Sequence, residues 1–229
     1  MNKKELVLRR HYRSLVKRVV LLFLLLWAVL WFNGCNIIAY GAQAFRTDQN
    51  PVDVAAEYTD LEGKRVAVLV AADEYTLFRF PRSPFRTGEA VSRGIVENLP
   101  EVSVSLPKEI ARYQRSNPYW ITTRPSRIID ELGVDRLVII DLNEYRTNEA
   151  GNINVWKGVI DGTVSVYEAD GEDPDNRTFE RQVRAEFPRD SEFGLVRDRA
   201  DEESVEAAVL EAFALKAGGL FYDHQEDRP

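Results

Sequence analysis

The chain has 229 residues, with 30 Lys and Arg against 37 Asp and Glu, 45% hydrophobic residues, one Cys and two His. This length fits one domain of ordinary size plus an appendage and argues against several domains. The apolar fraction excludes wholesale disorder, and a single Cys excludes both an intramolecular disulfide framework and a multi-cysteine zinc site.

The first 34 residues have the pattern of an export signal. Seven basic residues and one acid come first, an unbroken apolar run covers residues 19–32, and Gly34 and Cys35 follow. This order predicts a bacterial lipoprotein signal, in which Cys35 is acylated and becomes the new N-terminus. Phe32 and Asn33 stand where such signals usually carry Leu and a small residue.

An uncleaved transmembrane anchor is the alternative interpretation of this segment, and a buried structural Cys35 is the third. No charge occurs between Arg18 and Arg46, so a helix over residues 19–45 is long enough to span a bilayer. Both membrane interpretations keep the basic flank in the cytoplasm and export the remainder. We therefore expect a protein of the bacterial cell envelope, held to the membrane by lipidated Cys35 or by the N-terminal helix, with its domain on the periplasmic side.

The exported part is strongly acidic. Residues 35–229 hold 23 Lys and Arg against 36 Asp and Glu, which is a formal charge of −13. A domain with this charge repels nucleic acid and anionic lipid headgroups. No nucleic-acid partner is expected.

A folded domain is predicted over residues 63–222, between a polar tether over residues 35–62 and a charged tail over residues 223–229. In chain order the expected elements are a strand over residues 65–72, a helix over 87–99, a strand over 102–106, helices over 107–116 and 125–132, strands over 136–145, 155–169 and 177–187, and a helix over 202–221. With the two middle helices taken together, the order is β-α-β-α-β-β-β-α. This order predicts a single α/β domain with a mixed β-sheet flanked by helices.

Three segments of this domain resemble a group of bacterial envelope proteins. They are residues 63–70 (GKRVAVLV), 133–140 (GVDRLVII) and 162–167 (GTVSVY). The group includes the penicillin-binding-protein activator lipoproteins, the curli-secretion-channel lipoproteins and the amino-terminal domain of TolB. The resemblance covers residues 60–222 and implies a partner-binding α/β fold without catalytic residues. A curli-type pore is disfavoured, because residues 35–229 contain no spare alternating hairpin with a lipid-compatible face.

No catalytic residue, metal site or cofactor is predicted. The one histidine of the exported part, His224, lies in the charged tail, and neither HExxH nor paired cysteines occur. The acidic loop over residues 170–176 does not match the EF-hand spacing and is interpreted as a solvated hairpin turn. The protein is therefore not expected to be an enzyme.

The segment LFRFPRSPFR, over residues 77–86, is the most distinctive part of the domain. Aromatic and Arg side chains are enriched at binding hot spots, and two prolines stiffen this segment. We predict a partner-binding loop made of Phe78, Arg79, Phe80, Arg82, Phe85 and Arg86. The alternative is that these aromatic side chains cover the ends of the sheet.

These observations predict a membrane-anchored extracytoplasmic lipoprotein whose α/β domain binds a partner protein in cell-envelope assembly or maintenance. A homo-oligomeric envelope scaffold, which self-associates through edge strands or helices, is the second expectation. The third is a carboxylate-dependent hydrolase that acts on wall glycan through Asp141, Glu144 and Asp161.

Overall fold

Strand β2 (Arg65–Ala72) is the first strand of the main sheet in the computed structural model, which describes residues 51–189 and 194–226. The predicted signal, Cys35 and most of the predicted tether lie outside these residues. Residues 66–70 of β2 are buried on both faces, as the continuous apolar run predicts. β2 pairs in parallel with β3 (Ser103–Val104) on one side and with β4 (Arg136–Glu149) on the other.

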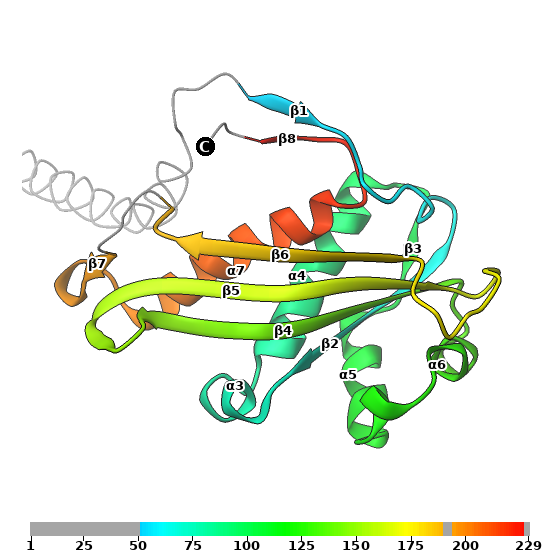
Figure 1. The fold of residues 1–229 in the computed structure, drawn as a ribbon, viewed down its shortest axis with the longest axis horizontal. Helices are drawn as coiled ribbons and strands as arrows, with labels where there is room; N and C mark the ends of the chain where they lie inside the picture. Colours follow the sequence, from blue (N-terminus) through cyan, green and yellow to red (C-terminus); the bar gives the residue numbers. More distant parts are fainter. Residues whose placement is uncertain (1–50, 190–193, 227–229) are drawn as a thin grey trace, which may run out of the picture. The chain divides into compact units, whose positions relative to one another are not determined.

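The rest of the sheet is antiparallel. β4 pairs with β5 (Asn152–Glu168), and β5 pairs with β6 (Phe179–Phe187) and with the short β7 (Leu195–Val196). The strand order is β3-β2-β4-β5-β6, and Figure 1 shows the longer strands side by side. The predicted mixed sheet of an α/β domain is confirmed.

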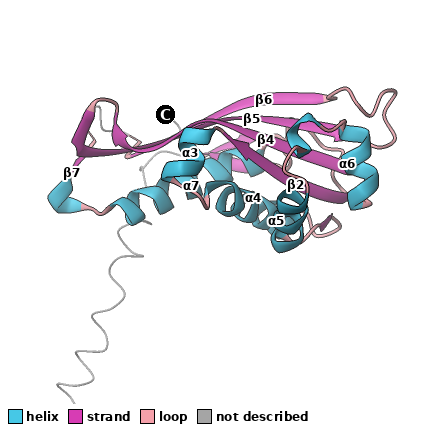
Figure 2. Ribbon diagram, turned by 90° about the horizontal axis from the view of Figure 1, so that it is seen from below, coloured by secondary structure: helices cyan, strands magenta, loops and turns pink. Residues whose placement is uncertain are grey.

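Helices α4 (Ser83–Asn98) and α7 (Glu202–Gly219) cover one face of the sheet. Two glycines allow this close approach. A Cβ added at Gly88 of α4 would lie 3.4 Å from Val70 of β2, and one at Gly158 of β5 would lie only 2.9 Å from Val209 of α7. Figure 2 shows α4 and α7 along the same side of the strands. The apolar side of α7 is buried here, at Val205, Val209, Ala212 and Phe213.

Helices α5 (Pro107–Ser116), η2 (Trp120–Thr122) and α6 (Pro125–Leu132) pack on the opposite face. Their buried residues Ile110, Trp120 and Ile128 form one cluster with Leu69 of β2 and Leu137 of β4. Gly133 ends α6 with φ 64° in the left-handed region, a conformation that glycine adopts without strain. Among the described residues, helices cover this face only over its β2–β4 part and leave the polar half of β4, β5 and β6 uncovered.

The structure corrects two predicted boundaries. The predicted loop over residues 77–86 contains the end of a helix, α3 (Glu74–Arg79), and the first residues of α4, which begins at Ser83 instead of Thr87. Pro84 does not interrupt α4, because proline is compatible with the first turn of a helix, where its missing N–H has no partner to lose. Residues 77–86 thus comprise the end of α3, a short turn and the start of α4.

The predicted tether and tail meet in a second, two-stranded sheet. β1 (Val52–Val54) pairs antiparallel with β8 (His224–Glu226). A short 3-10 helix, η3 (Arg197–Arg199), precedes α7. Backbone N–H groups of Glu57 and Tyr58 donate to the carbonyl of Leu220, which ties the residues after β1 to the end of α7.

Buried Arg136, the first residue of β4, joins three separate segments. Its side chain is 4% exposed and contacts Asp170 Oδ1 at 2.5 Å and Glu168 Oε2 at 3.7 Å. Its Nε and Nη1 atoms donate to the carbonyls of Asp60 and Asp135 at 3.1 and 2.9 Å. The hydroxyl of Tyr58 donates to Glu168 at 2.7 Å, so the residues that precede β2 are bound to the β5–β6 hairpin.

Candidate partner-binding site

A hollow lies between the start of α4 and one side of α5. It has a volume of about 490 Å³ and is lined by Pro81, Arg82, Phe85, Lys108, Ala111, Arg112 and Arg115. We name this set of residues the cationic hollow. Its size is in the range of pockets that bind small molecules or short peptide segments.

The crossovers of the sheet bring the start of α4 and α5 together at the cationic hollow. The chain leaves the carboxyl end of β2 toward α4 on one face of the sheet, and leaves the carboxyl end of the neighbouring strand β3 toward α5 on the other face. Arg82 and Phe85 come from the α4 side of the hollow, and the remaining cations come from α5.

The four cations of the hollow make no ion pair and no side-chain hydrogen bond with any residue of the described chain. The side chains of Arg82, Lys108, Arg112 and Arg115 are all exposed. Most other cations of the domain are paired: Arg86 contacts Glu206 at 2.7 Å, and Arg65 contacts Asp135 at 2.8 Å. The hollow therefore concentrates four positive charges, which repel one another, at one place on an acidic protein.

The structure divides the six residues of the predicted binding loop into three groups. Arg82 and Phe85 line the cationic hollow. Phe78 is 83% exposed on α3, and its ring does not take part in an aromatic contact with a described residue.

Arg79, Phe80 and Arg86 form the third group, because they contact other parts of the domain. Arg79 pairs with Glu202 at 3.4 Å, and Arg86 with Glu206 at 2.7 Å, so both bind the first turns of α7. The ring of Phe80 lies 5.0 Å from that of Tyr145. These three residues connect α3 and α4 to α7 and β4.

The α5 residues of the hollow were missed by sequence reasoning. Lys108, Arg112 and Arg115 follow a spacing of four and three residues, which places them on one face of a helix. That spacing was visible in the predicted helix over residues 107–116. The adjacency of this face to Arg82 and Phe85 depends on the crossover between β2 and β3, which only the structure shows.

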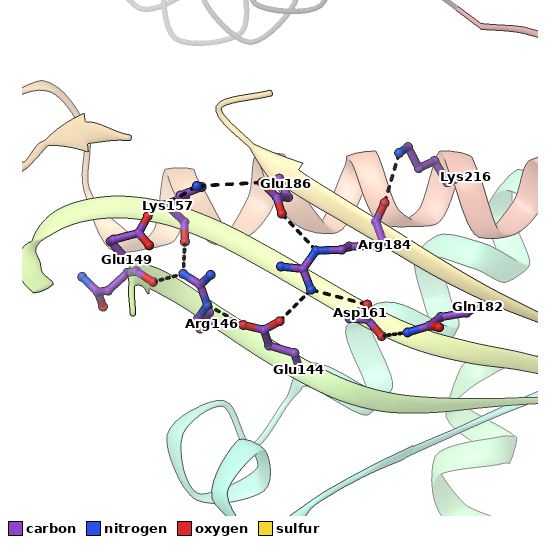
Figure 3. A network of polar contacts seen from close by, with 10 residues as sticks. Glu144, Arg146, Glu149, Lys157, Asp161, Gln182, Arg184, Glu186 and Lys216 are labelled. Atoms are coloured by element: carbon purple, nitrogen blue, oxygen red, sulfur yellow. Dashed lines mark hydrogen bonds and ion pairs between the residues drawn. The ribbon is translucent and has the colours of Figure 1, made fainter. Parts of the chain in front are cut away.

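The three carboxylates of the hydrolase alternative do not gather at one point. Glu144 and Asp161 both contact Arg184, at 2.8 and 3.4 Å, and Figure 3 shows the guanidinium between them. Asp141 lies opposite Thr163, further along β4 and β5. Although burial acts in the other direction, hydrogen bonds from Arg146 and Arg184 lower the pKa of Glu144 below its ordinary value.

These contacts belong to a larger ion-pair network on the open face of the sheet. Arg184 also contacts Glu186 at 2.9 Å, Lys157 contacts Glu149 at 3.5 Å, and Gln182 donates to Asp161 at 3.0 Å (Figure 3). Alternating charges on neighbouring strands stabilise a solvent-facing sheet surface. Glu144 and Asp161 are therefore members of a surface ion-pair network.

Asp141 belongs to a second, shallower hollow at the edge of this open face. The hollow has a volume of about 500 Å³, and its lining includes Asp73, Ile121, Asp141 and Thr163. Burial raises the pKa of Asp141, and the charge of Arg177 opposes that shift. Asp73 is already engaged as the N-cap of α3, since its carboxylate accepts a hydrogen bond from the N–H of Thr76.

Two further properties concern the described residues only. No helix within residues 51–189 and 194–226 has the length and apolar character that crossing a membrane requires. In the same ranges, no three His, Cys, Asp or Glu side chains are placed to hold a metal ion.

Comparison with known proteins identifies neighbours in fold only. No protein-family model and no curated protein matches the chain. Among solved structures, the chain is similar to lipoprotein GNA1162 from Neisseria meningitidis, with 10% identity, 63% of this chain and 92% of that chain covered, and a TM-score of 0.42. It is similar to the PelC dodecamer from Paraburkholderia phytofirmans, with 10% identity, coverage of 73% and 96%, and a TM-score of 0.41.

A TolB chain from Acinetobacter baumannii is also among the neighbours, with 10% identity, coverage of 71% of this chain and 31% of that chain, and a TM-score of 0.27. The predicted resemblance names the amino-terminal domain of TolB. These neighbours are bacterial proteins and include a lipoprotein, but at such TM-scores the likeness carries no argument about family or function.

Proposed function

We propose that this protein is a membrane-anchored extracytoplasmic lipoprotein whose α/β domain binds a partner protein of the cell envelope, without catalysis. The cationic hollow is the main observation that supports this proposal. It gathers four unpaired cations and an aromatic ring between α4 and α5 of an otherwise acidic domain. A surface of this composition is suited to recognition, because it offers both charge and apolar contact area.

The absence of a partner for these cations within the described chain supports an external ligand. The Arg side chains that stabilise the fold, such as Arg86 and Arg136, are placed against carboxylates. Glu144 and Asp161 are likewise both paired with a guanidinium group, so neither carboxylate is free for acid–base catalysis. Binding therefore has more support than hydrolysis.

The scaffold alternative has one supporting feature, the outer edge of β6. Its backbone is not paired with another strand of the described chain. However, Lys216 donates to the carbonyl of Arg184, and Arg181 is paired with Glu57, so side chains already occupy this edge. Edge strands that are covered in this way resist pairing with a second copy. Partner binding at the cationic hollow remains the main proposal.

Photo-crosslinking in living cells tests the proposal. A photo-reactive amino acid replaces Ala111 inside the cationic hollow in the full-length, tagged protein. The matched control carries it at Arg93, an exposed residue of α4 outside the hollow. We expect one heterologous partner to be crosslinked from position 111 and not from position 93. Crosslinks to further copies of this chain would favour the scaffold, and equal crosslinking from both positions would contradict the proposal.

The lipid anchor needs its own test, because Cys35 lies outside the described residues. Metabolic labelling with a palmitate analogue is expected to mark the full-length protein and to fail on a Cys35→Ser variant. Unchanged labelling of that variant would contradict acylation at this residue. A membrane-bound but unlabelled protein would favour the uncleaved anchor.

A further inference from the structure

Three of the cations of the hollow lie in a row along α5, and this spacing restricts the chemistry of the ligand. Lys108 and Arg112 are four residues apart and Arg115 is three residues further, which places their Cα atoms about 6 and 4.5 Å apart along the helix axis. The charges thus form a row about 10 Å long. A compact anion such as phosphate reaches only part of that row.

An extended peptide has a matching repeat. Alternate residues of an extended chain lie about 6.6 Å apart and point to the same side. Carboxylates at alternate positions therefore face successive cations of α5. The intervening side chains point the other way, toward the wall that carries Pro81 and Phe85, where apolar contact is available. Arg82, on the same wall, is positioned beside the backbone or the end of such a segment.

We propose that the cationic hollow binds an extended acidic peptide segment of the partner protein, in which Asp or Glu alternates with apolar residues. The inference rests on the proposed function and specifies its ligand. A lipid headgroup fits less well, because a membrane surface would bring its negative charge close to the whole acidic domain (−13 over residues 35–229), whereas a short peptide contacts the cationic hollow alone. Free phosphate fits less well, because it leaves the apolar wall unused.

Peptide titration tests this inference directly. The probe is a fluorescein-labelled peptide, Gly-Glu-Leu-Glu-Leu-Glu-Gly, titrated with full-length protein in non-ionic micelles and followed by anisotropy. We expect saturable binding at low salt that weakens strongly as the ionic strength approaches 1 M, where the Debye length falls to about 3 Å. One comparison peptide carries Gln in place of every Glu. The other carries the same residues in two blocks, with Glu-Glu-Glu followed by Leu-Leu. Both are expected to bind much more weakly.

Matched variants locate the binding. Arg112→Glu reverses one charge in the middle of the row and is expected to weaken peptide binding about tenfold or more, because it removes an attraction and adds a repulsion. Arg112→Gln is the milder variant and is expected to weaken binding severalfold. Arg93→Glu, on the neighbouring helix, makes the same charge change outside the hollow and is expected to leave binding within about twofold, since distant surface charges are screened. Thermal unfolding checks that each variant is folded.

Several results would overturn the inference. Equal affinity for the Glu and Gln peptides would exclude charge recognition, and equal effects of Arg93→Glu and Arg112→Glu would exclude the hollow. Displacement of the peptide by millimolar inorganic phosphate would favour a small anion, and tighter binding to vesicles of phosphatidylglycerol would favour a headgroup. If position 111 crosslinks a partner while the peptide fails to bind, the peptide ligand is wrong and the proposed function stands. If no partner is crosslinked, the proposed function fails independently.

Discussion

Replacing Arg136 by Met removes all of its hydrogen-bond donors while keeping a side chain of similar length in the same buried place. The guanidinium is almost fully enclosed and serves two carboxylates and two backbone carbonyls. Without it, Glu168 keeps only the hydrogen bond from Tyr58, and both carbonyls lose a donor. Removing one partner of a buried ion pair costs about 3–5 kcal/mol. The exposed side of the cluster, at Asp170, contributes less, because solvent screens it.

We therefore expect Arg136→Met to lower the free energy of unfolding by about 3–4 kcal/mol, a large share of the ~5–15 kcal/mol typical of a domain. Urea unfolding followed by circular dichroism measures this change. Arg65→Met is the matched control, because Arg65 also pairs with an aspartate, Asp135, but is mostly exposed. That variant is expected to unfold almost as the unchanged protein does.

A second substitution separates the buried charge from lost packing. Adding Glu168→Gln to Arg136→Met removes the carboxylate that was left without its cation, so the double variant is expected to be more stable than Arg136→Met alone. Two results would refute the reasoning that this ion cluster holds the residues before β2 to the β5–β6 hairpin. One is a decrease in unfolding free energy below about 1 kcal/mol for Arg136→Met, and the other is a double variant no more stable than Arg136→Met.

Three further predictions concern packing and pH. Gly158→Ala forces a methyl group against Val209, 2.9 Å away, and should destabilise the domain by about 1–3 kcal/mol in urea unfolding, whereas Gly171→Ala, with its nearest contact at 3.4 Å, should change little. Thr87→Val replaces a buried hydroxyl that has no hydrogen-bond partner and should raise the unfolding free energy by about 1 kcal/mol; a loss would mean that this hydroxyl is paired. Hydrogen bonds from a guanidinium and an ammonium group lower the pKa of Asp170 from 3.8 to about 2, so its stabilising effect should be complete above about pH 4 and disappear as the pH falls through 2. Denaturation at several pH values should therefore show Asp170→Asn less stable than the unchanged protein at pH 6, with the difference vanishing as the pH falls below 2.

The core of the fold was predictable because its signals are local. The apolar run of β2 indicates burial on both faces within eight residues, and Gly133 marks the end of α6 by itself. Proline was harder to interpret, because Pro84 is equally compatible with a loop and with the first turn of α4. The pairing of Val52–Val54 with His224–Glu226 was not predictable, since strands of three residues carry no periodicity and these lie at opposite ends of the domain.

The candidate site was predictable only in part, because its arrangement depends on contacts between segments that are distant in the sequence. The composition of residues 77–86 indicates binding, and two of its residues line the cationic hollow. Whether an Arg or Phe of that segment faces solvent or the fold depends on distant partners: Glu202 and Glu206 on α7 hold Arg79 and Arg86. No pattern within the segment distinguishes those arginines from Arg82.

The central claim is that a partner protein of the envelope binds at the cationic hollow. Its most direct test is the yield of partner recovered with the tagged, full-length protein after chemical crosslinking in cells, compared between an Arg112→Glu, Arg115→Glu variant and the Arg93→Glu control. The account predicts that the double variant, at equal abundance, loses most of the partner while the control retains it. Equal recovery from both variants would contradict the claim and place the binding surface elsewhere.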